Sequence, residues 1–293
     1  MSAPTPPPSG WARELGRFLE IQNLGLNLPF ALAFLLAAAQ GLPRWQTFVL
    51  VVIAVLAARN AGHAFNRWVD RKLDAQNPRT QGRALVTGRL SPGFALGVTA
   101  ASGAVLVAAA AFLNPLSFAL SPVALALVLG YSYTKRFTSW TTLFLGLVEA
   151  AVPGAVFIAV TGTLPWVAVV AVFAVLAWGT AFEKIHSLGD MPTDQRLGLH
   201  SLPRRLGIQA SVVMVGGLHA VALALFALFG GLERYGLPFW VAWAAMAGLV
   251  AYSDLTLSRH LDRVRVPFER HFVLAMLFLA GVVVSLAVPG LRF

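Results

Sequence analysis

Nine long apolar segments constrain this chain more than any other feature of its sequence. A helix that crosses a membrane needs about 20 mostly apolar residues, because the hydrocarbon core of a bilayer is about 30 Å thick. Segments of this kind run over residues 20–41, 46–69, 93–113, 116–133, 141–161, 165–187, 209–230, 237–256 and 270–289. We therefore expect an all-α polytopic membrane protein with about nine transmembrane helices.

The composition supports a membrane protein. Of the 293 residues, 58% are hydrophobic and only 12% are charged, whereas soluble globular proteins carry about 25% charged residues. The chain has no cysteine, which excludes disulfides, thiolate metal sites and cysteine nucleophiles. Any metal ion must therefore be held by oxygen or imidazole ligands.

The distribution of lysine and arginine indicates the orientation of the chain. With the N-terminus in the cytoplasm, 18 of the 22 basic residues fall in cytoplasmic segments, as the positive-inside rule requires. The other side holds Arg44, Arg234 and Arg292, and Arg59 lies within the second apolar segment. This asymmetry accounts for the net charge of +10 without a nucleic-acid partner. We expect a multi-pass protein of the cell (inner or plasma) membrane whose functional site opens to the cytoplasm.

The N-terminal segment differs in character from the rest of the chain. It is rich in proline and polar residues and lacks the charged and apolar regions of a cleaved signal peptide. We expect residues 1–12 to form a disordered tail and residues 13–293 to form a single transmembrane domain.

The first candidate motif lies at the end of the second apolar segment. Asn66, Asp70 and Asp74 are spaced four residues apart, so a helix places them on one face. Arg59 and His63 extend that face into the membrane. A polar row on an apolar helix is costly unless it lines a cavity or finds partners. Its oxygens suit Mg²⁺, although the aspartates could instead pair with neighbouring basic residues at the membrane surface.

The second candidate motif follows the sixth apolar segment. Glu183, Asp190 and Asp194 again lie close to one helical face. Pro192 cannot continue a helix without losing a hydrogen bond, so we expect the helix to end near Gly189. Asp194 would then lie in a loop or open a short following helix. The alternative role is again surface ion pairing with nearby basic residues.

Two acidic clusters at one membrane face are more specific than either cluster alone. Facing carboxylates repel one another unless cations bridge them, and bound metal with a diphosphate would resolve that repulsion. Basic residues are available for the diphosphate in the adjoining loops: Arg79, Arg83, Lys135 and Arg136. The positive-inside rule alone also explains these residues.

Five runs of sequence resemble the UbiA superfamily of intramembrane prenyltransferases. Asn66 to Asp74 matches that superfamily's NxxxDxxxD signature, and DMPTD resembles its second DxxxD motif. The runs are NRWVDRKLD (66–74), NPRTQGRALVTG (77–88), YSYTKR (131–136), DMPTD (190–194) and GLHSLP (198–203). The resemblance extends from about Phe18 to about Gly207, and the last three helices match in hydropathy alone.

The resemblance implies a fold, a cofactor and a set of site residues. The fold is nine transmembrane helices around a central cavity closed by cytoplasmic cap loops. The implied Mg²⁺ ligands are Asn66, Asp70, Asp74, Glu183, Asp190 and Asp194, of which the four aspartates are the catalytic candidates. The candidates for substrate binding are Arg59, Asn66, Arg79, Arg83, Lys135, Arg136, Asn23 and His186.

The second motif departs from the superfamily pattern. Glu183 and His186 stand where the pattern has Asp and Tyr. Glutamate keeps the charge, whereas histidine changes the size and protonation behaviour of the side chain, so we expect functional novelty here. Gln22, Asn23 and Asn27 are polar where the first helix would border an acceptor pocket.

The function implied by the resemblance is prenyl transfer in quinone biosynthesis. The donor would be a polyprenyl diphosphate, and the acceptor a hydroxynaphthoate or 4-hydroxybenzoate, in menaquinone or ubiquinone synthesis. Other lipid, pigment or haem prenyltransferases of the superfamily are alternatives. A transporter of an anionic metabolite is an alternative from another class, but it would place polar residues at the membrane midplane. A non-catalytic relative is a third alternative, against which the five motif residues Asn66, Asp70, Asp74, Asp190 and Asp194 argue.

Overall fold

The structure is a computed structural model that describes residues 10–21, 24–259 and 265–288. Over these ranges the chain is helical and contains no strand. The elements are α1 (Trp11–Phe18), α2 (Leu24–Ala39), α3 (Trp45–Asp74), α4 (Pro92–Leu113), α5 (Pro115–Gly130), the 3₁₀ helix η2 (Tyr131–Arg136), α6 (Thr141–Thr161), α7 (Trp166–Leu197), α8 (Leu202–Leu206), α9 (Ile208–Leu232), α10 (Leu237–Arg259) and α11 (Arg265–Ala287).

The expected all-α membrane architecture is confirmed. Among the described residues, eight helices are long and apolar enough to cross a membrane. The remaining expected span, residues 20–41, corresponds to α2, which has 16 residues and contains Pro29. At 1.5 Å per residue α2 is about 24 Å long, so it is shorter than the hydrocarbon core.

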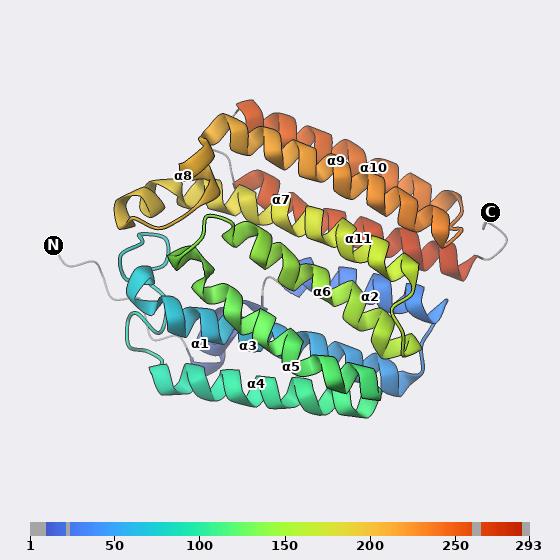
Figure 1. The fold of residues 1–293 in the computed structure, drawn as a ribbon, viewed down its shortest axis with the longest axis horizontal. Coiled ribbons are helices and arrows are strands. Elements are labelled where there is room, and N and C mark those ends of the chain that lie inside the picture. Colours follow the sequence, from blue (N-terminus) through green and yellow to red (C-terminus); the bar gives the residue numbers. More distant parts are fainter. Residues whose placement is uncertain (1–9, 22–23, 260–264, 289–293) are drawn as a thin grey trace.

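The long helices lie side by side and form a closed arrangement (Figure 1). Helices α3, α4 and α5 pack together on one side, and α9, α10 and α11 lie on the other. Helices α2, α6 and α7 connect these two groups, since α2 contacts α11, α3 and α6 while α7 contacts α6 and α9.

An aromatic core fills the half of the molecule built by α2, α7, α9, α10 and α11. The ring of Phe278 lies 5.3 Å from that of Phe30 and 4.9 Å from that of Phe226, measured between centroids. Trp178 closes the cluster with an edge contact to Phe30. These side chains are buried, and such aromatic pairs contribute about 0.5–1.5 kcal/mol beyond their buried area.

Small side chains leave the other half hollow. Two adjoining apolar cavities of about 270 and 290 Å³ lie between α3, α4, α5 and α6. Their walls share Ala54, Val55, Leu106, Ala124, Ala151 and Ala155. The molecule therefore has one half filled by aromatic side chains and another half with room for a long apolar ligand.

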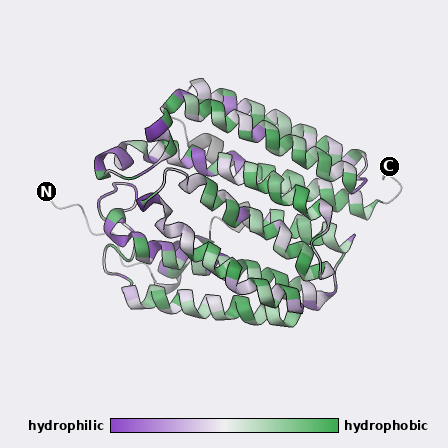
Figure 2. Ribbon diagram, in the orientation of Figure 1, coloured by the Kyte–Doolittle hydropathy of each residue, from purple (hydrophilic) through white to green (hydrophobic). Residues whose placement is uncertain are grey.

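Helices α3 and α7 carry the candidate motifs beyond the membrane. They contain 30 and 32 residues, or about 45 Å of helix each, which exceeds a hydrocarbon core of about 30 Å. The hydrophilic residues gather at the end where these helices meet the long loops, and the middle of the bundle is hydrophobic (Figure 2). The acidic motifs lie at this polar end.

The expected end of α7 near Gly189 is wrong. The helix continues through Pro192 to Leu197 and ends at Gly198, whose left-handed φ of +68° suits glycine. A proline removes one helical hydrogen bond, and contacts with the loop after α3 hold the turns around it. Arg79 donates to Asp190 on one side of Pro192, and Arg196 donates to the carbonyl of Gln76 on the other. Asp194 is therefore helical.

A short helix at the N-terminal end was not expected. Because α1 begins at Trp11, the last two residues of the segment 1–12 are helical, and residues 1–9 lie outside the described ranges. Arg89 Nη1 lies 3.0 Å from the Glu14 carboxylate, and Arg67 Nη2 lies 2.6 Å from that of Glu20. These ion pairs tie the N-terminal residues to α3 and to the loop after it.

Candidate functional site

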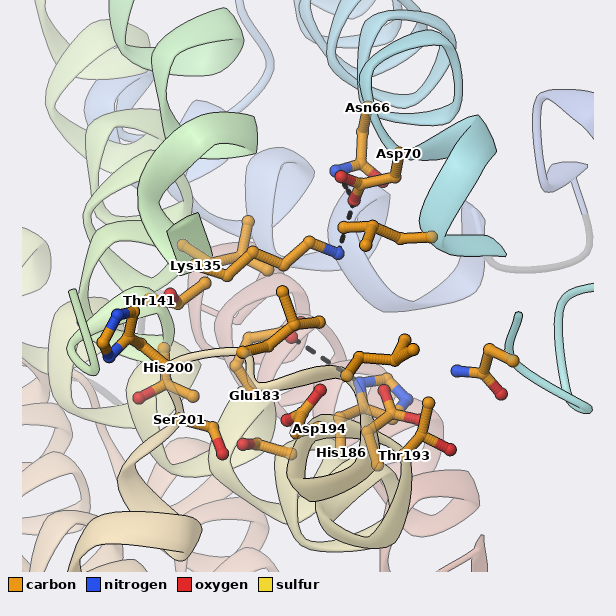
Figure 3. Close-up of a pocket in the computed structure, with 18 of the residues that line it drawn as sticks. Asn66, Asp70, Lys135, Thr141, Glu183, His186, Thr193, Asp194, His200 and Ser201 are labelled. Atoms are coloured by element: carbon orange, nitrogen blue, oxygen red, sulfur yellow. Dashed lines mark hydrogen bonds and ion pairs between the residues drawn. The ribbon is translucent and has the colours of Figure 1, made fainter. Parts of the chain in front are cut away.

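A polar cavity of about 240 Å³ lies between the polar ends of α3 and α7, beside η2. Figure 3 shows the two acidic motifs on opposite sides of it, with Asp70 on α3 and Asp194 on α7. The predicted residues that line the cavity are Asn66, Asp70, Asp74, Arg79, Arg83, Lys135, Glu183, His186, Asp190 and Asp194.

Asp70 is buried at the centre of the first motif. Lys135 Nζ lies 2.6 Å from Asp70 Oδ2, and Arg136 Nη2 lies 3.1 Å from Oδ1. The amide of Asn66, one turn earlier on α3, donates to Oδ2 at 3.1 Å. Two cations and an amide therefore hold this carboxylate in place.

The loop after α3 supplies partners for both motifs. Arg83 Nη1 contacts both carboxylate oxygens of Asp74, at 2.9 and 2.8 Å. Arg79 makes a two-point contact with Asp190, from Nε at 3.1 Å and from Nη2 at 2.7 Å. Such paired contacts fix the orientation of a guanidinium group. Arg79 thus bridges the first motif's loop to the second motif.

Two predicted substrate-binding residues, Arg136 and Arg59, do not line the polar cavity. Arg136 contacts Asp70 but is absent from the wall of the polar cavity, and its Nη1 donates to the Ser132 carbonyl. Arg59 lines the apolar cavity and donates to the carbonyls of Leu19 and Glu20. Asn23 lies outside the described residues.

The charges around the polar cavity do not balance. Five carboxylates line it, but only three permanently cationic side chains do: Arg79, Arg83 and Lys135. With neutral histidines these lining side chains have a formal charge of −2, which Arg136, paired with Asp70 from outside the wall, reduces to −1. A diphosphate entering this cavity would meet net repulsion unless further cations enter with it.

The donor set fits Mg²⁺. The six predicted ligands all line this cavity, and carboxylate and amide oxygens are hard ligands of the kind that Mg²⁺ takes. Among the described residues no three acidic or histidine side chains form a preformed metal cluster. Mg²⁺ bound beside substrate phosphates does not need one, because one or two carboxylates per ion suffice and water and phosphate complete the shell.

The polar cavity adjoins the first apolar cavity. Tyr131, Leu145, Glu183 and His186 line both. The apolar cavity then continues into the second one along α3, α5 and α6. An amphipathic ligand with an anionic head and a long apolar tail matches this sequence of spaces.

Several residues of the site had not been singled out from the sequence. Ser132, Thr193 and Ser201 line the polar cavity, and Glu149 lines the apolar one. Nothing in the sequence distinguishes these serine and threonine residues from others. Glu149 could have been recognised, because it is the only acidic residue between Asp74 and Glu183 and it interrupts an apolar segment.

Comparison with known proteins assigns the family. Residues 27–280 match the UbiA prenyltransferase family. The chain belongs to this family. It is therefore a prenyltransferase, and the alternative of a transporter is set aside.

Relatives in the UbiA family match over most of the chain. A 4-hydroxybenzoate octaprenyltransferase from Burkholderia vietnamiensis is 30% identical over 257 residues, or 86% of this chain and 87% of the relative. The protein of the same name from Vibrio campbellii is 33% identical over 231 residues, covering 78% and 80% of the two chains.

Solved structures share the fold. The apo structure of a UbiA homologue from Aeropyrum pernix superposes with a TM-score of 0.82 and 30% identity, covering 90% of this chain and 98% of the homologue. A UbiA homologue from Archaeoglobus fulgidus bound to DMAPP and Mg²⁺ gives a TM-score of 0.72 at 19% identity, covering 94% and 99%. The latter likeness concerns the fold alone.

Proposed function

We propose that this UbiA-family enzyme transfers a polyprenyl group from its diphosphate to a hydroxylated aromatic acid, with 4-hydroxybenzoate as the favoured acceptor and Mg²⁺ as the cofactor. The observation that carries the proposal is the excess of carboxylates in a polar cavity that opens into a long apolar one. Relatives about 30% identical to this chain are 4-hydroxybenzoate octaprenyltransferases, which favours this acceptor over a hydroxynaphthoate.

The two acidic motifs serve the diphosphate end of the donor. Asn66, Asp70 and Asp74 would hold one side of the metal–diphosphate group, and Glu183, Asp190 and Asp194 would hold the other. Bound Mg²⁺ stabilises the negative charge that develops on the leaving diphosphate. A homologue with the same fold was solved with DMAPP and Mg²⁺, which supports a magnesium–prenyl diphosphate ligand for this fold.

The basic residues exchange partners when the donor binds. Arg79 and Arg83 contact Asp190 and Asp74 in this structure. With metal bound to these carboxylates, the two guanidinium groups and the Lys135 ammonium would be available to bind the diphosphate oxygens.

The apolar cavities hold the prenyl chain. Their walls are largely alanine, valine and leucine, which exclude water from the reacting carbon. The polar end, with most of the basic residues, faces the cytoplasm, so that a water-soluble acceptor reaches the site from that side.

A transfer assay tests this function. The purified protein in lipid nanodiscs is incubated with Mg²⁺, radiolabelled farnesyl diphosphate and either 4-hydroxybenzoate or 1,4-dihydroxy-2-naphthoate. We expect a labelled prenylated product with 4-hydroxybenzoate, and none in EDTA. Transfer to the naphthoate alone would show that the naphthoate, and not 4-hydroxybenzoate, is the acceptor. If the folded protein transfers the prenyl group to neither compound, the proposal is refuted.

A further inference from the structure

Glu149 is a carboxyl group inside the membrane-spanning part of α6. It interrupts the run LFLGLVEAAVPG and is eight residues from the start of the helix. An acidic side chain costs several kcal/mol at membrane depth, and such residues generally face a cavity and serve function. The two acidic motifs do not include it.

The side chain of Glu149 is directed at α7. A Cβ atom built on Gly179 would lie only 2.1 Å from Glu149 Oε2, and its three nearest atoms all belong to Glu149. The absence of a side chain at position 179 therefore makes room for this carboxyl group. The neighbouring Gly146 lies against Thr180 in the same way, so α6 and α7 are close enough for the carboxyl group to reach α7.

Glu149 also faces open space. It lines the apolar cavity that adjoins the polar one, together with Tyr131, Phe182 and His186. No hydrogen bond to its carboxyl group is found among the described residues. A carboxyl group in an apolar cavity needs a polar partner, and a bound ligand can supply it.

The position of Gly179 on α7 shows how deep in the membrane-spanning part the Glu149 carboxyl group lies. Gly179 precedes Glu183 by four residues, so the Glu149 carboxyl group lies about 6 Å deeper than the level of Glu183. Glu183 marks the boundary of the two cavities, where the carbon next to the diphosphate must lie. A hydrogen bond of about 2.7 Å from the carboxyl group to the acceptor hydroxyl group and a near-attack separation of about 3–3.5 Å between the ring carbon and the prenyl carbon together bridge a gap of this size.

We propose that Glu149 is a catalytic residue that binds the hydroxyl group of the aromatic acceptor and accepts its proton. This inference rests on the proposed function and adds the acceptor side of the same site. Tyr131 and Phe182 line the space that the ring would occupy.

The proposed step balances. The carboxylate takes the hydroxyl proton as the ring carbon bonds to C1 of the prenyl group, and the C1–O bond breaks with its electron pair leaving on the diphosphate. The ring is then a ketone with one hydrogen on the new sp³ carbon. That hydrogen leaves as a proton to the released diphosphate, while Glu149 returns its proton to the ring oxygen.

The first test replaces the carboxyl group by an amide. Glu149→Gln has nearly the same shape but cannot accept the proton, so we expect kcat with 4-hydroxybenzoate to fall about 100-fold or more. Its affinity for farnesyl thiodiphosphate with Mg²⁺ should stay within twofold of the wild type. The matched control is Glu233→Gln, at the opposite end of the molecule, where Glu233 accepts a hydrogen bond from Gln40; its activity should be unchanged.

The second test moves the carboxyl group without removing it. In Gly179→Ala the new Cβ collides with the flexible end of Glu149, and a displacement of about 1 Å can lower a rate by about 100-fold. In a Glu149→Ala background the collision is gone, so adding Gly179→Ala should change the residual rate less than twofold. Equal losses of rate from Gly179→Ala in both backgrounds would mean that its effect does not act through Glu149, and would contradict the inference.

The outcomes separate this inference from the proposed function. If the wild type transfers the prenyl group and Asp70→Asn does not, while Glu149→Gln stays within threefold of the wild type, the inference is wrong and the function stands. If the wild type transfers to neither acceptor, both are wrong. Loss of thiodiphosphate binding in Glu149→Gln would also overturn the acceptor role.

Discussion

Asp70 is the residue on which the donor site depends most. It is buried, and its two oxygens face Lys135, Arg136 and Asn66. Only a charged carboxylate matches this environment, because an amide supplies one neutral oxygen and leaves cations without a partner.

Replacing this charge should abolish transfer. We expect Asp70→Asn to lower kcat/KM for prenyl diphosphate at least 100-fold, since the variant loses a carboxylate ligand of the Mg²⁺ that would stabilise the leaving diphosphate. The measurement is labelled product per minute at equal amounts of folded protein, judged by size-exclusion profile. If the variant keeps more than a third of the wild-type rate, Asp70 is not a functional residue of the donor site.

Arg79 should contribute affinity rather than rate. A charge-assisted hydrogen bond to a diphosphate is worth about 1.5–3 kcal/mol, so Arg79→Gln should weaken binding of farnesyl thiodiphosphate about 10- to 100-fold. Arg44→Gln is the matched control, because Arg44 caps the start of α3 at the opposite end. Equal affinities of the two variants would show that Arg79 serves only to hold Asp190.

At the scale of elements, the close contact of α6 and α7 positions both cavities. A Cβ atom at Gly146 would lie 2.3 Å from Thr180 Oγ1 and 3.0 Å from its backbone nitrogen. Backbone cannot yield as a flexible side chain can, so this glycine sets the distance between the helices.

Gly146→Ala should therefore destabilise the protein. Forcing a methyl group into a packed contact costs about 1–3 kcal/mol, and we expect a lower Tm in detergent. The control is Gly97→Ala in α4, where a Cβ atom meets nothing within 4 Å; there alanine should be neutral or stabilise the helix by up to about 1 kcal/mol. An unchanged Tm in Gly146→Ala would mean that α6 and α7 can accommodate a methyl group at this position.

Much of the fold, and most of the candidate site, could be predicted from the sequence, because apolar length and four-residue spacing are local signals. Asp70 and Asp190 illustrate this, since both line the polar cavity as expected. The end of α7 could not be predicted from the sequence, because tertiary contacts of Asp190 and Arg196 override the local effect of Pro192. The hydrogen bond from Arg59 to the carbonyl of Leu19 could not be predicted either, because the two residues are 40 positions apart in the sequence.

At the scale of the whole molecule, the charge asymmetry predicts orientation. The chain has no cysteine, so single cysteines can report it directly. Ala75 lies at the polar end and Thr163 in the short loop at the other end, and both are exposed. We expect an impermeant maleimide applied to intact spheroplasts to label Thr163→Cys but not Ala75→Cys. The reverse pattern would place the polar end outside the cell.

The cavities also predict how the molecule responds to its ligands. Carboxylates outnumber the cationic side chains around the polar cavity, so metal and diphosphate bound together would join α3 and α7 through it. Neither ligand alone satisfies both motifs, so binding should be strongly cooperative.

Metal binding measured by electron paramagnetic resonance tests the account most directly, with Mn²⁺ in place of Mg²⁺ and farnesyl thiodiphosphate as the unreactive donor. We predict tight Mn²⁺ binding only when the diphosphate is present, and its loss in both Asp70→Asn and Asp190→Asn. Diphosphate binding that is unaffected by EDTA, or Mn²⁺ binding that survives both substitutions, would contradict the claim that the two acidic motifs hold metal and diphosphate together.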